Sequence, residues 1–174
     1  MFEKNYIFYN NKRINELSNP NIKINIHGSE NEIFIQDFFG DGILDIKIEG
    51  NRNIFKLGKN NRINNTLTID FHSVEDGTPE ECSILIGDGN EFNGNVSIVS
   101  SSEPGTVISV GNNNLFANKI SLRGAAFHLL FNMQTMEPLN KEEGISIGSQ
   151  NWICDDVLFL NKPALSGRKK SELL

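Results

Sequence analysis

Cysteine is scarce in this 174-residue chain, and its placement excludes two classes of protein. The two cysteines, Cys82 and Cys154, are far apart, and the sequence has no Cys-x-x-Cys motif and no Cys/His cluster with the spacing of a zinc site. A disulfide-dense scaffold and a zinc module are therefore excluded, and no metal is expected. A disulfide between the two cysteines remains an alternative, but we expect buried free thiols, as in a cytoplasmic protein.

The chain also lacks a long apolar run and an excess of positive charge. No apolar stretch approaches the roughly 20 residues of a membrane span, and the N-terminus has no basic region followed by an apolar one. Lys and Arg total 16 against 22 Asp and Glu, a net charge of -6, which argues against a nucleic-acid binder that works through bulk charge. We therefore expect one cytoplasmic domain without a membrane span or a nucleic-acid partner.

Three residue types are abundant instead. The sequence contains 25 Asn, 21 Ile and 15 Gly. Asn and Gly tolerate left-handed turn conformations, whereas Ile prefers strands. Such a composition predicts many short strands joined by tight corners.

The unit Gly-x-x-Asn recurs six times, each time with Ile or Phe two residues after the Asn. The copies are Gly28/Asn31, Gly50/Asn53, Gly58/Asn61, Gly87/Asn90, Gly111/Asn114 and Gly148/Asn151. The last three extend to 13 residues that align without gaps, beginning at Ile86, Val110 and Ile147. Apolar residues at steps of about six with a small turn residue are the hexapeptide pattern of a parallel β-helix.

The fold class expected is therefore all-β, a single-stranded parallel β-helix with protruding loops. Inward positions hold aliphatic residues, Gly or Asn takes the corners that need a positive φ, and Asn side chains at equivalent corners form an amide ladder. A β-sandwich also fits short strands with turn signals and remains the alternative fold. We expect an N-terminal segment at 1–20, a β-helix at 21–160 with loops near 72–82, 100–105 and 123–143, and a non-repeat tail at 161–174.

The stretch from Ile145 to Leu160, Ile-Ser-Ile-Gly-Ser-Gln-Asn-Trp-Ile-Cys-Asp-Asp-Val-Leu-Phe-Leu, resembles the Ile-Gly-x-His-Val-Trp-Ile-Gly-x-x-Val-x-Ile-Leu segment of the hexapeptide-repeat acyltransferases. Upstream, Leu-Arg-Gly-Ala-Ala-Phe-His, ending at His128, resembles the family's Ile-Arg-x-x-Asp-x-His, and Glu-Pro-Leu-Asn, ending at Asn140, is similar to its Gly-Glu-x-Ile-Asn. The match covers about residues 84–162 and looks closest to the branch that acetylates sugars and surface polysaccharides.

The resemblance implies a left-handed coil and an acetyl-CoA-dependent O-acetyltransferase acting on a sugar or polysaccharide precursor. His128 falls on the catalytic histidine, a general base suited to neutral pH. Trp152 falls on a tryptophan beside the active site, where an indole packs on the ligand. The alternative is that Trp152 is a hydrophobic packing residue at the junction between loop and coil. Asn140 falls on a loop asparagine, and Arg123, which opens the same loop, is a candidate to meet an acidic ligand or to form a surface ion pair. Such enzymes are usually homotrimers that bind the coenzyme between neighbouring prisms.

The sequence also departs from the family pattern. Ala126 stands where the family has Asp, Gln150 replaces the histidine of its His-Val-Trp segment, and Cys154 replaces the following Gly. The family usually adds further coils beyond the segment that ends here at Leu160. These departures leave open a catalytically inactive β-helix scaffold or binding protein, or a truncated fragment of an acetyltransferase.

Overall fold

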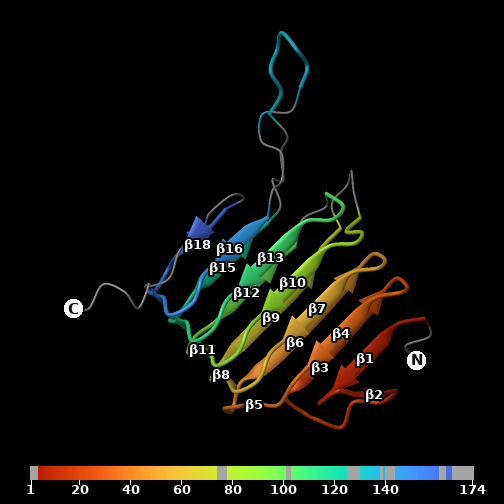
Figure 1. Cartoon of the computed structure of the whole chain (residues 1–174), viewed down its shortest axis with the longest axis vertical. Coiled ribbons are helices and arrows are strands. Elements are labelled where there is room, and N and C mark those ends of the chain that lie inside the picture. The colour runs from red at the N-terminus through yellow and green to blue at the C-terminus, as the bar shows by residue number, and fades with distance from the viewer. Residues whose placement is uncertain are drawn as a thin grey trace.

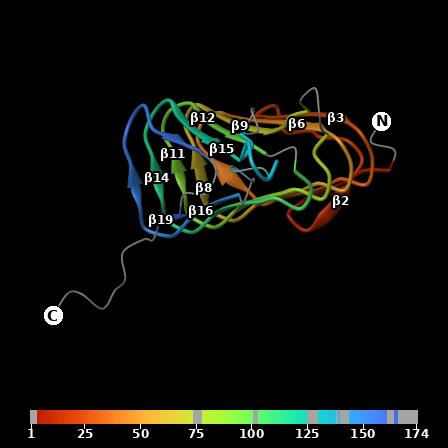
Figure 2. The ribbon, with the colours of Figure 1, turned by 90° about the horizontal axis from the view of Figure 1, so that it is seen from above.

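The computed structural model describes residues 4–73, 78–100, 103–124, 130–137, 139, 144–160 and 164–165. All regular secondary structure in these residues is β-strand, arranged in three sheets through which the chain coils repeatedly (Figure 1). Figure 2 shows β3, β6, β9 and β12 along one side of the prism and β16 and β19 along the opposite side. The strands β8, β11 and β14 form the third side, which joins the other two.

Five successive coils of the described residues, from β4 to β18, contribute one strand to each sheet, and β1, β2, β3 and β19 come from the coils at the two ends. The eight-stranded sheet contains, in spatial order, β19 (Ala164–Leu165), β16 (Ile145–Ile147), β13 (Val107–Val110), β10 (Ser83–Ile86), β7 (Ile54–Leu57), β4 (Glu32–Ile35), β1 (Tyr6–Tyr9) and β2 (Lys12–Ile14). The five-stranded sheet contains β17 (Trp152–Ile153), β14 (Leu115–Phe116), β11 (Glu91–Phe92), β8 (Asn61–Ile63) and β5 (Phe38–Phe39). The six-stranded sheet contains β18 (Leu158–Phe159), β15 (Ile120–Arg123), β12 (Val96–Val99), β9 (Thr66–Phe71), β6 (Ile43–Glu49) and β3 (Ile22–His27).

The strands of successive coils pair in parallel and in register. In the eight-stranded sheet, for example, Phe55 lies opposite Ile84 and Ile84 opposite Ile108, and all three are buried. The inward residues of every coil therefore stack on like residues above and below, so one apolar core runs the length of the prism. The parallel β-helix expected from the hexapeptide steps is confirmed, and the β-sandwich alternative, whose sheets would be antiparallel, is wrong.

Buried asparagines form amide ladders between the coils, as the sequence predicts. The Asn90 Oδ1 atom accepts hydrogen bonds from the backbone N–H of Asn114 at 2.9 Å and from its Nδ2 group at 3.0 Å, and Asn114 does the same for Asn151 at 2.9 Å each. A second ladder runs through Asn31 and Asn53 at a different corner. The six Gly-x-x-Asn copies thus belong to two corners. No buried side-chain polar atom in the described residues lacks a hydrogen-bond partner.

The expectation that Gly or Asn takes the positive-φ positions of the corners holds only in part, because Glu30, Arg52 and Gln150 also occupy such positions. The asparagine of each repeat has an ordinary backbone conformation, whereas the residue just before it is left-handed: Glu30, Arg52, Asn60, Gly89, Asn113 and Gln150. Most of these carry a Cβ atom and would avoid that conformation in an isolated chain. The hydrogen bonds of the buried asparagine that follows hold the corner in place.

At both corners the stacked backbones leave no room for a Cβ atom on the glycine of the repeat, since one on Gly28 would overlap the Gly50 carbonyl oxygen, and the first corner also has a positive φ. Gly28 and Gly50 have φ values of +144° and +120°. Gly58, Gly87 and Gly111 do not, but a Cβ atom on Gly87 would lie 2.9 Å from the Gly111 carbonyl oxygen, and one on Gly111 would lie 2.8 Å from that of Gly148. Glycine is needed at this second corner because stacked backbones approach too closely for a side chain.

The N-terminal end of the prism is closed by a hairpin. β1 pairs in parallel with β4, and β2 folds back antiparallel on β1 through Asn10 and Asn11, whose φ values of 48° and 63° match a two-residue type I′ turn. Ile14 packs against the end of the core. Both strands lie within residues 1–20, which the sequence sets apart as an N-terminal segment, and β19 lies within the tail expected at 161–174.

The expected excursions lie between strands of adjacent coils. Residues 72–82 connect β9 with β10, and their end returns to the coil, because the Cys82 N–H donates to the Asn53 Oδ1 atom at 3.1 Å. Residues 123–143 connect β15 with β16. Cys82 is buried and Cys154 is exposed, and both are free, so the expectation of buried thiols holds only for Cys82. In the part of the chain that the structure describes, no helix is long and apolar enough to cross a membrane.

We predict that the Asn114→Ala variant loses roughly 2–4 kcal/mol of unfolding free energy. The substitution removes the acceptor of two Asn151 donors and leaves the Gly148 carbonyl without its Nδ2 donor. Urea denaturation measures the change, with Asn65→Ala, an exposed asparagine in a corner, as the control. Equal losses in the two variants would contradict a structural role for the ladder.

The left-handed corner at Gln150 gives a second prediction. Gln150 is exposed, has a φ of 63°, and donates its backbone N–H to the Asn112 carbonyl at 2.9 Å. Gln150→Gly should raise the unfolding free energy by about 0.5–1 kcal/mol because glycine has no Cβ penalty there. Gln150→Ala keeps the Cβ atom and should leave stability nearly unchanged, so an equal gain in both variants in thermal denaturation would refute this explanation.

Candidate functional site

Two of the four site residues predicted from the sequence can be located. Arg123 ends β15 on the six-stranded sheet, and Trp152 begins β17 on the five-stranded sheet. His128 and Asn140 lie outside the described residues, as does Ala126. Arg123 and Trp152 therefore project from different faces of the prism, and the structure does not bring these two side chains together on one sheet.

Trp152 lies on the surface of its sheet. Its side chain is 77% exposed, whereas the next residue, Ile153, is buried with 4% exposure. Trp152 lies opposite Leu115 in the parallel register, with its indole outside the core. This exposure does not fit a filler between loop and coil and leaves the indole free to contact a ligand.

The described part of the long excursion between β15 and β16 lies away from the prism. We call residues 130–137 and 139 the arm; Figure 1 shows it well beyond the ends of the sheets. The arm has an internal turn, in which the Asn132 N–H donates to the Glu137 carbonyl at 2.9 Å and the Asn132 Oδ1 atom accepts from the Gln134 N–H at 2.8 Å. Its apolar side chains are nevertheless exposed, namely Leu130, Phe131, Met133, Met136 and Leu139.

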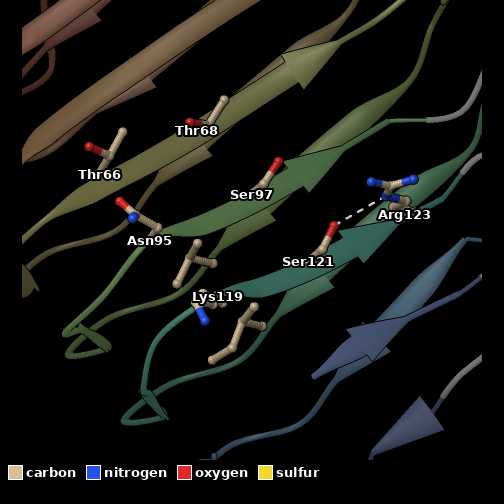
Figure 3. Close-up of a pocket in the computed structure, with 9 residues that line it drawn as sticks. Thr66, Thr68, Asn95, Ser97, Lys119, Ser121 and Arg123 are labelled. Atoms are coloured by element: carbon tan, nitrogen blue, oxygen red, sulfur yellow. Dashed lines mark hydrogen bonds between the residues drawn. The ribbon is translucent and has the colours of Figure 1, made fainter. Parts of the chain in front are cut away.

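A shallow groove of about 430 Å³ lies on the outer face of the six-stranded sheet, over β9, β12 and β15 (Figure 3). Its floor is a row of three hydroxyl side chains, because Ser97 lies opposite Thr68 on one side and Ser121 on the other. A second row contains Thr66, Asn95 and the stem of Lys119. The same strands turn their buried alternate residues inward, so the outward hydroxyls are available to solvent.

Two cations lie at opposite ends of β15 in this groove. Lys119 immediately precedes the strand and Arg123 ends it. The Lys119 ammonium is 3.5 Å from an Asp156 carboxylate oxygen, and both side chains are exposed, so the pair contributes little. The Arg123 Nε group donates to the Ser121 Oγ atom at 3.3 Å, which orients the guanidinium along the groove (Figure 3).

Apart from Asp156, which pairs with Lys119 from the next coil, the acidic groups discussed here lie in earlier coils. Burial raises the pKa of the Asp70 carboxyl above its ordinary value, partly offset by the nearby His72 and Lys47. The pKa of Glu49 is lowered, chiefly because its carboxylate accepts the Ser73 backbone N–H at 3.0 Å. Among the described residues no group of three or more His, Cys, Asp or Glu side chains could hold a metal ion. The face therefore has mixed charge over β6 and β9 and a positive groove over β12 and β15.

The sequence contains a signal for this groove that the prediction of site residues did not use. Ser97 and Ser121 occupy the same place in the aligned repeats, between two inward apolar residues. An outward position filled by serine in consecutive coils indicates a continuous hydroxyl surface. Its neighbours Thr66 and Thr68 come from an earlier coil outside the 13-residue alignment, so only the register places them there.

Comparison with models of known protein families finds no match for the sequence, and comparison with curated proteins finds none either. Among solved structures, the chain is similar to the polySia-specific acetyltransferase NeuO, with a TM-score of 0.69 and 17% sequence identity. The superposition covers 91% of this chain and 61% of that chain, so this chain spans less than two thirds of the length of its structural neighbour. The likeness confirms the expected fold class, an all-β, left-handed parallel β-helix.

The exposure of Trp152 predicts that its removal hardly affects stability. Trp152→Ala should change the free energy of unfolding by less than about 0.5 kcal/mol, as at other exposed positions. Ile153→Ala, one residue later and buried, should cost about 2–5 kcal/mol. Urea denaturation of the two variants checks the contrast; a Trp152→Ala loss as large as that of Ile153→Ala would show that the indole is part of the core.

Proposed function

We propose that the chain is an acetyl-CoA-dependent O-acetyltransferase that acts on a hydroxyl of a sugar or polysaccharide. The observation that carries this proposal is the structural likeness to a polysaccharide acetyltransferase over 91% of the chain. The motifs ending at His128, Asn140 and Leu160 support it independently, because they resemble segments of the hexapeptide-repeat acyltransferases in the second half of the same prism.

His128 is the proposed general base. Acetyl-CoA supplies an activated acetyl thioester, and the imidazole of His128 takes the proton from the acceptor hydroxyl as its oxygen attacks the acetyl carbonyl. The same imidazolium then returns a proton to the departing sulfur. Gly124, the last described residue before the segment that carries His128, donates its N–H to the Val99 carbonyl at 2.9 Å, at the end of a strand that lines the groove. This attachment supports a role for the groove in presenting the acceptor.

The described residues fit the proposed ligands in kind. The exposed Trp152 indole beside Leu115 is a flat apolar surface of the sort that an adenine or a pantetheine chain packs against. Arg123 is proposed to bind the acceptor, since it ends the groove with a guanidinium directed along it. Asn140, by resemblance, is a second acceptor-binding residue. No metal takes part in the proposed reaction.

We also propose a cytoplasmic homotrimer. Support comes from the arm, whose exposed Leu, Phe and Met side chains are unusual on a monomer surface and suit burial against a neighbouring prism. The family resemblance implies a coenzyme site between prisms, which would need this association.

A second function, glycan or protein binding without catalysis, is favoured by one specific observation. Gln150 stands where the family segment has histidine. It lies at a corner, its side chain is exposed, and its side-chain amide makes no hydrogen bond within the described residues. A chain that keeps the scaffold but not the chemistry would bind acetyl-CoA or glycan without releasing thiol.

Thiol release from acetyl-CoA in the presence of sugar and polysaccharide acceptors tests the proposal. The unaltered chain should release CoA thiol, and His128→Ala should lower the rate by about 10²- to 10⁴-fold, the usual contribution of a general base. His72→Ala is the matched control, because His72 lies 4.0 Å from Glu49 on an earlier coil. Binding of acetyl-CoA without thiol release would favour the non-catalytic function, and full activity in His128→Ala would refute the role of that residue.

A further inference from the structure

We propose that the groove on the six-stranded sheet binds a segment of an acidic glycan, with Lys119 and Arg123 pairing with two of its anionic groups. The proposal names the acceptor class of the proposed acetyltransferase and in that sense rests on it. Binding in the groove is nevertheless measurable without any transfer reaction.

The groove lies where short outward side chains of β9, β12 and β15 are neighbours. Along its central row the register runs from Asp45 through Thr68, Ser97 and Ser121 to Leu158. The three middle residues carry short hydroxyl side chains, whereas Leu158 at one end of the row is larger and Asp45 at the other end is charged. Because parallel strands lie about 4.8 Å apart, three small residues in a row leave a hollow wide enough to seat a sugar ring.

The lining matches the polar surface of a sugar. Each Ser and Thr hydroxyl both donates and accepts a hydrogen bond, and the Asn95 amide offers a donor and an acceptor. Val96 and Ile120 lie between these rows, but their side chains are buried in the core, so the surface of the groove is mainly polar. A lining of closely spaced hydroxyls and an amide suits a ligand that is itself rich in hydroxyls.

The charges indicate an acidic ligand. None of the nine residues that line the groove is Asp or Glu, although the chain as a whole has a net charge of -6. The exposed pair of Lys119 with Asp156 is weak, so a ligand carboxylate can replace Asp156 at little cost. The guanidinium of Arg123 is suited to bidentate binding of a carboxylate.

The spacing of the two cations indicates a chain rather than a single sugar. Lys119 and Arg123 are four residues apart on one extended segment, which places their backbones about 13 Å apart at about 3.3 Å per residue. A monosaccharide with one carboxylate could pair with both only if the two long side chains converged on it. A glycan segment with repeated anionic groups can lie along β15, pair with both, and place its hydroxyls over Ser97 and Ser121.

A phosphate of CoA is the other anion that two cations could bind. The groove floor of hydroxyls, together with the Asn95 amide, favours the glycan. The exposed indole of Trp152, which suits an adenine or a pantetheine chain, lies on the five-stranded sheet. The experiment therefore measures both ligands on the same variants.

Calorimetric titration tests the proposal with an oligosialic acid, an oligogalacturonic acid and a neutral maltooligosaccharide of equal length, and with CoA. Both acidic oligomers should bind more tightly than the neutral one, and added salt should weaken that binding. Lys119→Gln and Arg123→Gln should each weaken it about tenfold, and Ser97→Tyr, which fills the hollow, by tenfold or more. Neutral-glycan and CoA binding should not change in the two charge variants.

Matched controls separate the groove from the rest of the surface. Lys23→Gln removes one positive charge from the same sheet at its N-terminal end, and Ser109→Tyr enlarges an outward serine on the eight-stranded sheet; both should bind acidic oligomers normally. The proposal would be overturned if neutral and acidic oligomers bound equally well, or if neither bound. It would also be overturned if Lys119→Gln and Arg123→Gln kept the affinity of the unaltered chain for acidic oligomers, or if these variants lost affinity for CoA alone. If Lys119→Gln and Arg123→Gln transferred acetyl to a neutral acceptor with unaltered kinetics, the acetyltransferase function would be supported and the acidic acceptor rejected.

Discussion

The rest of this structure depends on the in-register stacking of parallel coils. Each strand takes its backbone hydrogen bonds from the coils on either side, so a coil cannot shift by one residue without turning its inward isoleucines and phenylalanines toward solvent. The corners have to repeat as faithfully as the strands. The Asn ladders meet this requirement, because the Oδ1 atoms of Asn90 and Asn114 each accept the backbone N–H of the equivalent asparagine in the next coil, and the Asn114 Nδ2 group donates to the Gly148 carbonyl of that coil.

The same register builds the surface on which function is proposed. Because side chains alternate along a strand, the residues that face outward in consecutive coils also stack in rows. On the six-stranded sheet these rows bring Thr68, Ser97 and Ser121 together although they are far apart in sequence. Lys119 and Arg123 then lie at the two ends of the last strand of that groove, where the chain leaves for the arm.

Much of the fold could be predicted from the sequence because the determinants repeat locally. Apolar residues at steps of six and the recurring Gly-x-x-Asn indicated coils, inward positions and amide ladders. The repeat could not distinguish the two corners, because both require the same Gly-x-x-Asn motif. Asn53 and Asn61 both end a copy of this motif, yet they lie eight residues apart in one coil and belong to different ladders. The site was harder to predict. Trp152 was identified from its motif alone, but its 77% exposure and its position on a different sheet from Arg123 depend on the coil path.

The sequence by itself determined that this chain forms a parallel β-helix with a long excursion near residues 123–143, since periodicity and turn chemistry are properties of neighbouring residues. Only the tertiary structure decided which outward side chains meet. The register between coils determines the hydroxyl floor of the groove and the position of the two cations around it. It also determines the left-handed residue before each ladder asparagine and the hairpin that closes the first coil. That register is set by hydrogen bonds and core packing between segments more than 20 residues apart, which no local pattern contains.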